Sequence, residues 1–169
     1  MPGWLVYFAS SILDAMQTDT NQKVAFPTIS SGATVELVND FHLVFITNDS
    51  GIVGVFEQIK SKLGLEINNC LTLVYSVSDK ESQPLFKAEL ESIEKRFPAQ
   101  LQTHYLFKGN LIARENADQI QQTLEIIINC NLRKLMLFWV QGETDFVESV
   151  SERLHFLGIQ PSQIYSQTF

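Results

Sequence analysis

Apolar residues follow two alternating patterns along the chain, and together these patterns predict strands and helices in turn. Short apolar runs rich in β-branched and aromatic residues predict strands at 42–46, 71–76, 101–107, 134–140 and 163–168. Apolar residues three or four positions apart predict amphipathic helices at 52–63, 84–97, 114–128 and 146–157. The chain is therefore expected to alternate strictly between strand and helix.

Proline and glycine set the expected boundaries of these helices. Pro84 suits the first turn of the second predicted helix, and Pro98 ends it. Gly158 is the expected residue just after the last helix, with Pro161 beyond it.

Five strands with intervening helices predict an α/β fold: a doubly wound, five-stranded parallel sheet with helices on both faces. The expected strand order is 3-2-1-4-5, with the alternating run 101–107 at an edge. In that order the chain reverses direction across the sheet between the first and fourth strands, and ligands bind outside the carboxyl ends of such a pair. The turns at 47–51 and 141–145 are expected to meet there.

Composition narrows the range of partners. The 169 residues suffice for one domain, expected at 40–169, with a short N-terminal segment at 1–39. A net charge of −7 argues against nucleic acids and anionic membranes as partners. The apolar run from Trp4 to Leu13 is too short to cross a bilayer and lacks the features of a signal peptide, so the expected location is the cytoplasm.

Cysteines and histidines do not occur at the spacings of metal sites. Cys70 and Cys130 have no neighbouring cysteine and are expected to be reduced, buried thiols. His42, His104 and His155 stand alone. A structural metal site is therefore not expected.

The first strand-to-helix turn carries the main candidate chemistry. Thr47 ends the apolar run, and the small residues Ser50 and Gly51 precede Ile52 at the start of a helix. The first N–H groups of a helix lack internal partners and attract phosphate, and small residues let a phosphate approach. The competing interpretation is that Asp49 or Ser50 is the N-cap of this helix and bonds to those groups itself.

Several segments resemble the nucleotide-binding half of the ferredoxin-NADP reductase superfamily, which includes the reductase part of flavohaemoglobins. VFITNDSGIVGVFEQIKSKL is similar to the family's first strand, phosphate loop and helix, and LTLVYSVSDKESQPLFKAELESIEKRFP to its second strand and helix. LFWVQGETDFVESVSERLHFLGI resembles its fourth strand and last helix, and IYSQTF resembles its closing strand with a terminal aromatic residue. The likeness covers about 40–169, and a weaker trace of the end of a flavin-binding barrel lies in 1–39.

The resemblance implies an NAD(P)H-binding module that passes hydride to a flavin held elsewhere. NAD or NADP would be its own cofactor, and FAD would come only through a partner. The positions that match the family's cofactor site are Thr47, Ser50, Gly51, Ile52, Ser76, Asp79, Gln141, Gly142 and Phe146. The catalytic residues are not identified by this match.

The chain departs from the family pattern at both turns of the expected site. Asn48-Asp49 replaces a glycine pair and Val53-Gly54 replaces Thr-Pro, while Gln141 replaces a cysteine and Glu143-Thr144-Asp145 replaces Pro-Pro-Gly. Helix N-termini favour a capping threonine and nearby carboxylates, and this preference alone explains Glu143-Thr144-Asp145 if Thr144 is an N-cap. The stretch 75–79 has no base to bind the 2′-phosphate of NADP. Asp79 could accept the ribose hydroxyl of NAD, and the competing interpretation is an exposed aspartate of the turn.

These departures leave three alternatives to a working cofactor site. A noncatalytic descendant would keep the fold for contact with a partner protein or for self-association, with Trp4 to Ile12 as its apolar surface. A hydrolase would use Ser50 as nucleophile, although the flanking glycines of such a turn are missing. Asp49, Glu143 and Asp145 would gather three negative charges in the crevice and could hold a magnesium ion.

Overall fold

Strands and helices alternate along the chain, as the sequence predicts. The computed structural model describes residues 41–63, 70–78, 83–107, 113–131 and 135–169. The elements are β1 (Phe41–Asn48), α2 (Ile52–Lys62), β2 (Cys70–Val77), α3 (Lys87–Arg96), β3 (Leu101–Phe107), α4 (Ala113–Cys130), β4 (Leu135–Gly142), α5 (Thr144–Phe156), a short 3₁₀ turn η1 (Pro161–Gln163) and β5 (Ile164–Thr168). The predicted segment 1–39 lies outside the described residues.

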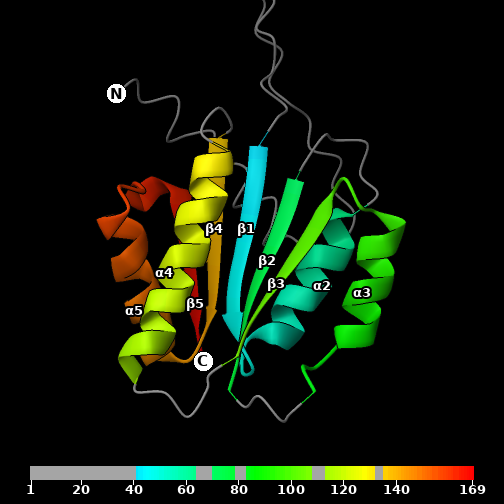
Figure 1. Cartoon of the computed structure of the whole chain (residues 1–169), viewed down its shortest axis with the longest axis horizontal. Helices are drawn as coiled ribbons and strands as arrows, with labels where there is room; N and C mark the ends of the chain where they lie inside the picture. The colour runs from blue at the N-terminus through cyan, green and yellow to red at the C-terminus, as the bar shows by residue number, and fades with distance from the viewer. Residues whose placement is uncertain (1–40, 64–69, 79–82, 108–112, 132–134) are drawn as a thin grey trace, which may run out of the picture.

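The five strands form one parallel sheet in the order β3-β2-β1-β4-β5, so the predicted fold class and order are confirmed (Figure 1). β3 is an edge strand, as its alternating sequence predicts. β1, β2 and β4 are buried along nearly their whole length, whereas β3 is mostly half-buried. The carboxyl ends of all strands therefore meet at one edge of the sheet, where the site was expected.

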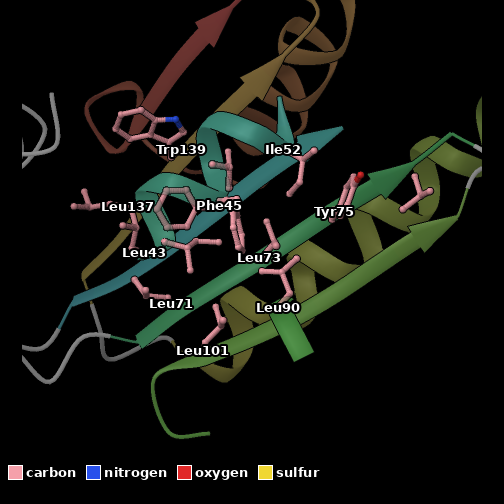
Figure 2. Close-up of a cluster of buried hydrophobic side chains, with 14 residues drawn as sticks. Leu43, Phe45, Ile52, Leu71, Leu73, Tyr75, Leu90, Leu101, Leu137 and Trp139 are labelled. Atoms are coloured by element: carbon pink, nitrogen blue, oxygen red, sulfur yellow. The ribbon is translucent and has the colours of Figure 1, made fainter. Parts of the chain in front are cut away.

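Alternate strand residues supply two separate cores, one on each face of the sheet. Phe45, Leu73 and Trp139 face α2 and α3, where Ile52 and Leu90 complete the cluster (Figure 2). The intervening strand residues face α4 and α5 and pack with the apolar stripes of those helices; they include Val44, Ile46, Val74, Phe138 and Val140. Because side chains alternate across a strand, one apolar run fills both cores.

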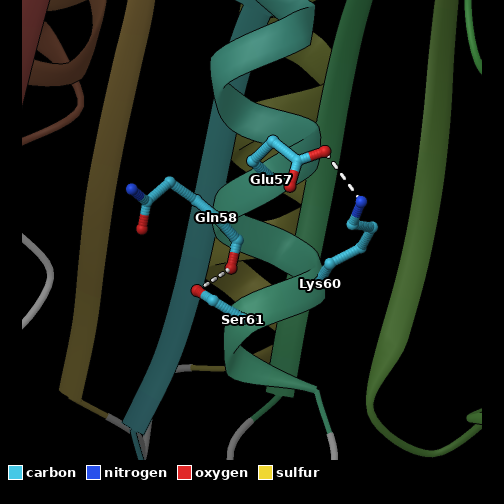
Figure 3. Close-up of polar contacts among 4 residues, drawn as sticks. All are labelled: Glu57, Gln58, Lys60 and Ser61. Carbon is cyan, nitrogen blue, oxygen red and sulfur yellow. Dashed lines mark hydrogen bonds and ion pairs between the residues drawn. The ribbon is translucent and has the colours of Figure 1, made fainter. Parts of the chain in front are cut away.

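The outer face of α2 carries polar side chains that contact one another within one helical turn (Figure 3). Lys60 Nζ lies 2.7 Å from Glu57 Oε1, and Ser61 Oγ donates to the Gln58 carbonyl oxygen at 2.8 Å. Ile52, Val55, Phe56 and Ile59 are buried on the opposite face. The helix is therefore held by its apolar stripe, and its one described ion pair is exposed.

Several element boundaries differ from the sequence-based expectation. The second predicted helix was expected to include Pro84, but α3 begins at Lys87 because Phe86 adopts a left-handed backbone conformation, with φ of 60°. The Phe86 ring stacks on Phe56, with ring centroids 4.3 Å apart, and this contact offsets the strain of the left-handed backbone. The spacing of apolar residues along the sequence does not predict such a conformation. β1 extends through Thr47 and Asn48, and β4 extends through Gln141 and Gly142, although these residues had been predicted to lie in turns.

Single residues at the ends of elements differ in how well they match the expectations from sequence. Gly158 does follow α5 in a left-handed conformation, with φ of 84°, which confirms it as the residue after the helix. Both cysteines are free, but Cys130 is exposed at the end of α4 and Cys70 is only partly buried, so the prediction of buried thiols was wrong. Phe169 is 67% exposed and fills no core. Within the described ranges, no helix is long and apolar enough to cross a membrane.

Candidate functional site

The carboxyl ends of β1 and β4 lie side by side and are joined by a hydrogen bond. Thr47 and Gln141 are paired in the parallel register, and Thr47 Oγ1 donates to the Gln141 carbonyl oxygen at 2.9 Å. Both side chains are buried. The strand order reverses between these two strands, so the two turns meet where an open α/β sheet binds its ligands.

Gly51 allows α2 to begin directly against the end of β4. A Cβ atom on Gly51 would lie 2.4 Å from the Gln141 carbonyl oxygen and 2.5 Å from Thr47 Oγ1. Gly54, one turn further, faces the Gln141 side chain, whose Oε1 accepts a hydrogen bond from Trp139 Nε1 at 3.2 Å. The positive end of the α2 dipole is thus fixed at the reversal point of the sheet.

The N-terminus of α2 is not capped by a side chain. Its N-cap is Gly51, so the prediction that Asp49 or Ser50 fills that position was wrong. Asn48 organises the turn before it, because its Oδ1 accepts from Ser50 Oγ at 2.7 Å and from the Gly51 N–H at 3.3 Å. The first turn of α2 contains no acidic residue. Its N–H groups therefore keep their affinity for an anion.

The Asp49 carboxylate is directed towards β2. Its Oδ1 accepts a hydrogen bond from the Tyr75 hydroxyl, and its Oδ2 accepts one from the Ser78 N–H, each at 2.8 Å. Burial raises the pKa of the Tyr75 phenol well above its ordinary value, and the hydrogen bond to Asp49 raises this pKa further. Asp49 thereby ties the β1–α2 turn to the end of the neighbouring strand.

The turn between β4 and α5 carries acidic residues, unlike the start of α2. Thr144 was expected to be the N-cap of α5, but Thr144 is the first helical residue and Glu143 is the N-cap, without a side-chain cap bond. Asp145 lies in the first turn, where a carboxylate complements the dipole. A Cβ on Gly142 would lie 2.6 Å from Asn48 Oδ1 and 3.0 Å from the Phe146 ring, so the second turn contacts the first through the Asn48 side chain.

The remaining predicted site residues have different surroundings. Ile52 is fully buried and supports the first turn from within the core. Ser76 is buried and paired in register with Asn48. Asp79 lies outside the described residues.

Two of the alternative sites lack their expected geometry. Among the described residues, no group of three or more carboxylate, histidine or cysteine side chains could hold a metal ion, so Asp49, Glu143 and Asp145 do not form a magnesium site. Ser50 Oγ donates to Asn48 Oδ1, which is not a base that could activate a nucleophile. The described residues therefore support neither a magnesium site nor a nucleophilic serine.

Sequence reasoning missed the structural role of Asn48. It had been considered only as a replacement for a glycine, yet its side chain holds the turn before α2. An asparagine three residues before a glycine, with a serine between them, is a recognisable signal for a turn closed by the Asn side chain. The short distance between Asn48 and Gly142 depends on the packing of two segments far apart in the chain, and no local sequence pattern predicts it.

Comparison with known structures identifies the fold. Ferredoxin-NADP+ reductase from Plasmodium falciparum matches 76% of this chain and 52% of its own, at 18% identity and a TM-score of 0.60. The CS-b5R domains of human Ncb5or in the NAD+ form match 77% of this chain and 37% of theirs, at 15% identity and a TM-score of 0.57. The cytochrome b5 reductase domain of Ulva prolifera nitrate reductase matches 75% of this chain and 49% of its own, at 14% identity and a TM-score of 0.54.

The sequence by itself finds no such relatives, since no family model and no curated protein matches it. The chain spans about half the length of the ferredoxin-NADP+ reductase that it matches. At these identities the likeness concerns the fold alone. The chain folds as a ferredoxin-reductase-like α/β domain.

Proposed function

We propose that the chain is an NAD(P)H-binding module of a ferredoxin-reductase-type oxidoreductase, which passes hydride to a flavin held by another domain or protein. The observation that carries this proposal is the uncapped N-terminus of α2, which begins at the reversal point of the sheet with no acidic residue in its first turn. The dinucleotide diphosphate would bind there. The solved structures of similar fold include one named for NADP+ and one in an NAD+ form.

The site residues have distinct parts in this proposal. Gly51 lets the start of α2 lie against the end of β4, and Thr47 holds the two strand ends together. Ser50 is exposed beside the diphosphate position. Gln141, Gly142 and Phe146 would line the nicotinamide side, and Ser76 with Asp79 the adenosine side. The nicotinamide supplies the hydride, while these residues bind and orient it.

Val53 provides a test that leaves the fold intact. It is the second residue of α2 and 54% exposed, so a glutamate at this position suits the helix dipole but repels a diphosphate. We expect calorimetry to detect binding of NADH or NADPH to the wild type and to the matched uncharged variant V53Q, and at least about tenfold weaker binding to V53E. Absence of heat at millimolar concentrations of both cofactors would overturn the proposal.

A noncatalytic role in protein contact is the second candidate, and one observation favours it. The Asn48 side chain lies between the two turns, within 2.6 Å of where a Cβ of Gly142 would be, so part of the crevice is filled by the chain itself. Contact surfaces would then lie elsewhere, for example in residues 4–12. Deletion of these residues should change the sedimentation coefficient of the assembly; an unchanged state of association would remove this segment as the contact surface.

The domain division is also a proposal: residues 40–169 form the cofactor-binding unit, and residues 1–39 are a remnant of the end of a flavin-binding barrel. All residues of the proposed site fall within the first of these units. Limited proteolysis that leaves a stable fragment beginning near residue 40 would support this boundary. Cleavage first within 40–169 would contradict it.

A further inference from the structure

We propose that the Gln141 side chain binds the diphosphate of the cofactor through its amide nitrogen, at the first turn of α2. The inference deepens the proposed function and rests on it. The family resemblance places Gln141 at the position of a cysteine on the nicotinamide side, and binding of the diphosphate by its side chain departs from that expectation. The direction of the side chain is the observation that carries the inference.

One hydrogen bond fixes the orientation of the Gln141 amide. Trp139 Nε1 donates to Gln141 Oε1 at 3.2 Å, and since only the oxygen of an amide can accept this bond, the nitrogen Nε2 points away from Trp139. Trp139 is itself buried, and its ring packs against those of Tyr165 and Phe45, at centroid distances of 4.1 and 6.3 Å. The donor of the orienting bond therefore has a fixed position.

The amide nitrogen of Gln141 lies against the first turn of α2. A Cβ atom on Gly54 would lie 2.4 Å from Nε2, so the amide is in contact with the backbone of Gly54. Gly54 is the third residue of α2, and the first N–H groups of a helix have no carbonyl partner within the helix. The amide nitrogen thus adds a further donor beside the positive end of the helix dipole.

The Gln141 amide nitrogen is a donor in a buried side chain that lacks an acceptor. Gln141 is 3% exposed, and its Nε2 donates no hydrogen bond within the described part of the chain. Burial of a polar group costs free energy unless a partner compensates, so this donor points to an acceptor that a ligand supplies. An anionic oxygen is the acceptor that both the amide and the uncapped N-terminus of α2 favour.

Two departures from the family pattern contact each other here. Gly54 stands where the family has a proline, and Gln141 stands where it has a cysteine. Because a Cβ at position 54 would overlap with Nε2, the Gln141 side chain can take this position only beside a glycine. A glycine in a helix lowers stability relative to alanine, and at this position it makes room for the amide donor.

Calorimetry with two ligands tests this role of Gln141: NADH, and ADP-ribose, which has the diphosphate and lacks the nicotinamide. Q141M removes the donor and keeps the length of the side chain, so we expect it to weaken the binding of both ligands by the same factor, on the order of tenfold. Q141E can still accept the hydrogen bond from Trp139 but brings a negative charge beside the diphosphate. It should weaken both ligands at least about tenfold more than Q141M does.

G54A tests the same donor from the other side of the contact. The three atoms nearest to the added Cβ all belong to the Gln141 side chain, and alanine favours a helix more than glycine does. G54A should therefore fold and yet bind both ligands about fivefold more weakly, because its Cβ displaces the amide. In the Q141M background the same change should have no further effect, since the donor is already absent.

Different results separate failure of this inference from failure of the proposed function. Weaker binding of NADH alone in Q141M would assign the amide to the nicotinamide and overturn the inference, while the proposed function would stand. Unchanged binding of both ligands in Q141M, equal binding in Q141E and Q141M, or a further loss from G54A in the Q141M background would likewise overturn it. Absence of binding of both ligands to the wild type would overturn the proposed function and this inference with it. Thermal unfolding verifies that each variant is folded, and Q141L replaces Q141M if that variant does not fold.

Discussion

The two strand-to-helix turns of the site share one backbone plan and carry opposite electrostatics. In each, a glycine lies close to the neighbouring turn and a helix follows within two residues. The α5 turn has Asp145 in the first turn of its helix, beside the exposed Glu143, whereas the α2 turn has no acidic residue there. An α/β sheet can therefore offer two geometrically similar helix ends of which only one is suited to an anion.

The turns also differ in how firmly their glycines are enclosed. Gly51 faces a backbone carbonyl oxygen of β4, and Gly142 faces the side chains of Asn48 and Phe146. Side chains can shift to accept an added methyl group, but a carbonyl within a buried strand cannot do so without disturbing the sheet. The first turn is thus the more rigid of the two, as a site for a charged ligand requires.

The largest effect on the free energy of unfolding should come from replacing Gly51 or Gly142 with alanine, one at a time. G51A places a Cβ 2.4 Å from the Gln141 carbonyl oxygen, so we expect it to lower the free energy of unfolding by about 3 kcal/mol. G142A should lower it less, by about 2 kcal/mol, because its nearest contacts are the side chains of Asn48 and Phe146, although Gly142 has a φ of 159°, which residues with a side chain rarely adopt. Urea unfolding measures both values. Equal losses would show that the two turns are equally enclosed.

An intermediate effect on stability should appear at alkaline pH. The folded protein raises the pKa of Tyr75 above its unfolded value of about 10, so the associated stability is fully present below pH 10 and is lost as the pH rises beyond it. Y75F should therefore flatten the decline of the urea midpoint above about pH 10. Tyr105, whose pKa burial raises to about 12, lies outside both turns and keeps its contribution in this variant.

A decline as steep in Y75F as in the wild type would show that ionisation of Tyr75 does not cause the loss of stability at alkaline pH. Y105F is the matched control, since it removes a tyrosine with a raised pKa and leaves this link intact. Urea midpoints of all three proteins should be measured over the same pH series.

The smallest effect on stability should come from variants that reverse the difference in charge between the N-termini of α2 and α5. V53E adds a carboxylate to the first turn of α2 and should raise the free energy of unfolding by about 0.5 kcal/mol, while D145N should lower it by a similar amount. V53Q is the uncharged control. Both changes should shrink as salt increases, because exposed charges at helix ends are screened. Changes of the same sign would contradict the dipole account.

Much of the fold could be predicted because its determinants are local and periodic. The alternation of core residues in β1, β2 and β4 and the helical spacing of apolar residues in α2 and α5 are visible in the sequence, and the order of the strands follows from general rules of parallel sheets. The start of α3 was not predictable in this way, since the left-handed Phe86 is held by its stacking on Phe56, thirty residues away.

The candidate site was predicted in location but not in chemistry. Sequence spacing brought Thr47 and Gln141 to the same edge, and their hydrogen bond confirms that the two turns meet. The role of Asp49 could not be derived from the sequence, because its carboxylate could accept hydrogen bonds either from the N–H groups of α2 or from the donors at the end of β2. Only the packed arrangement of β1 and β2 settles that choice in favour of Tyr75 and Ser78.

The sequence by itself determined the alternating elements, the two-sided burial of the central strands and the edge of the sheet where small residues gather. These follow from the period of the apolar positions and from turn residues a few positions apart. The tertiary structure alone decided which residue begins α2, where the Asp49 charge lies and how closely the two turns approach. Each depends on distances of a few ångströms between segments far apart in the chain, which short-range patterns do not encode.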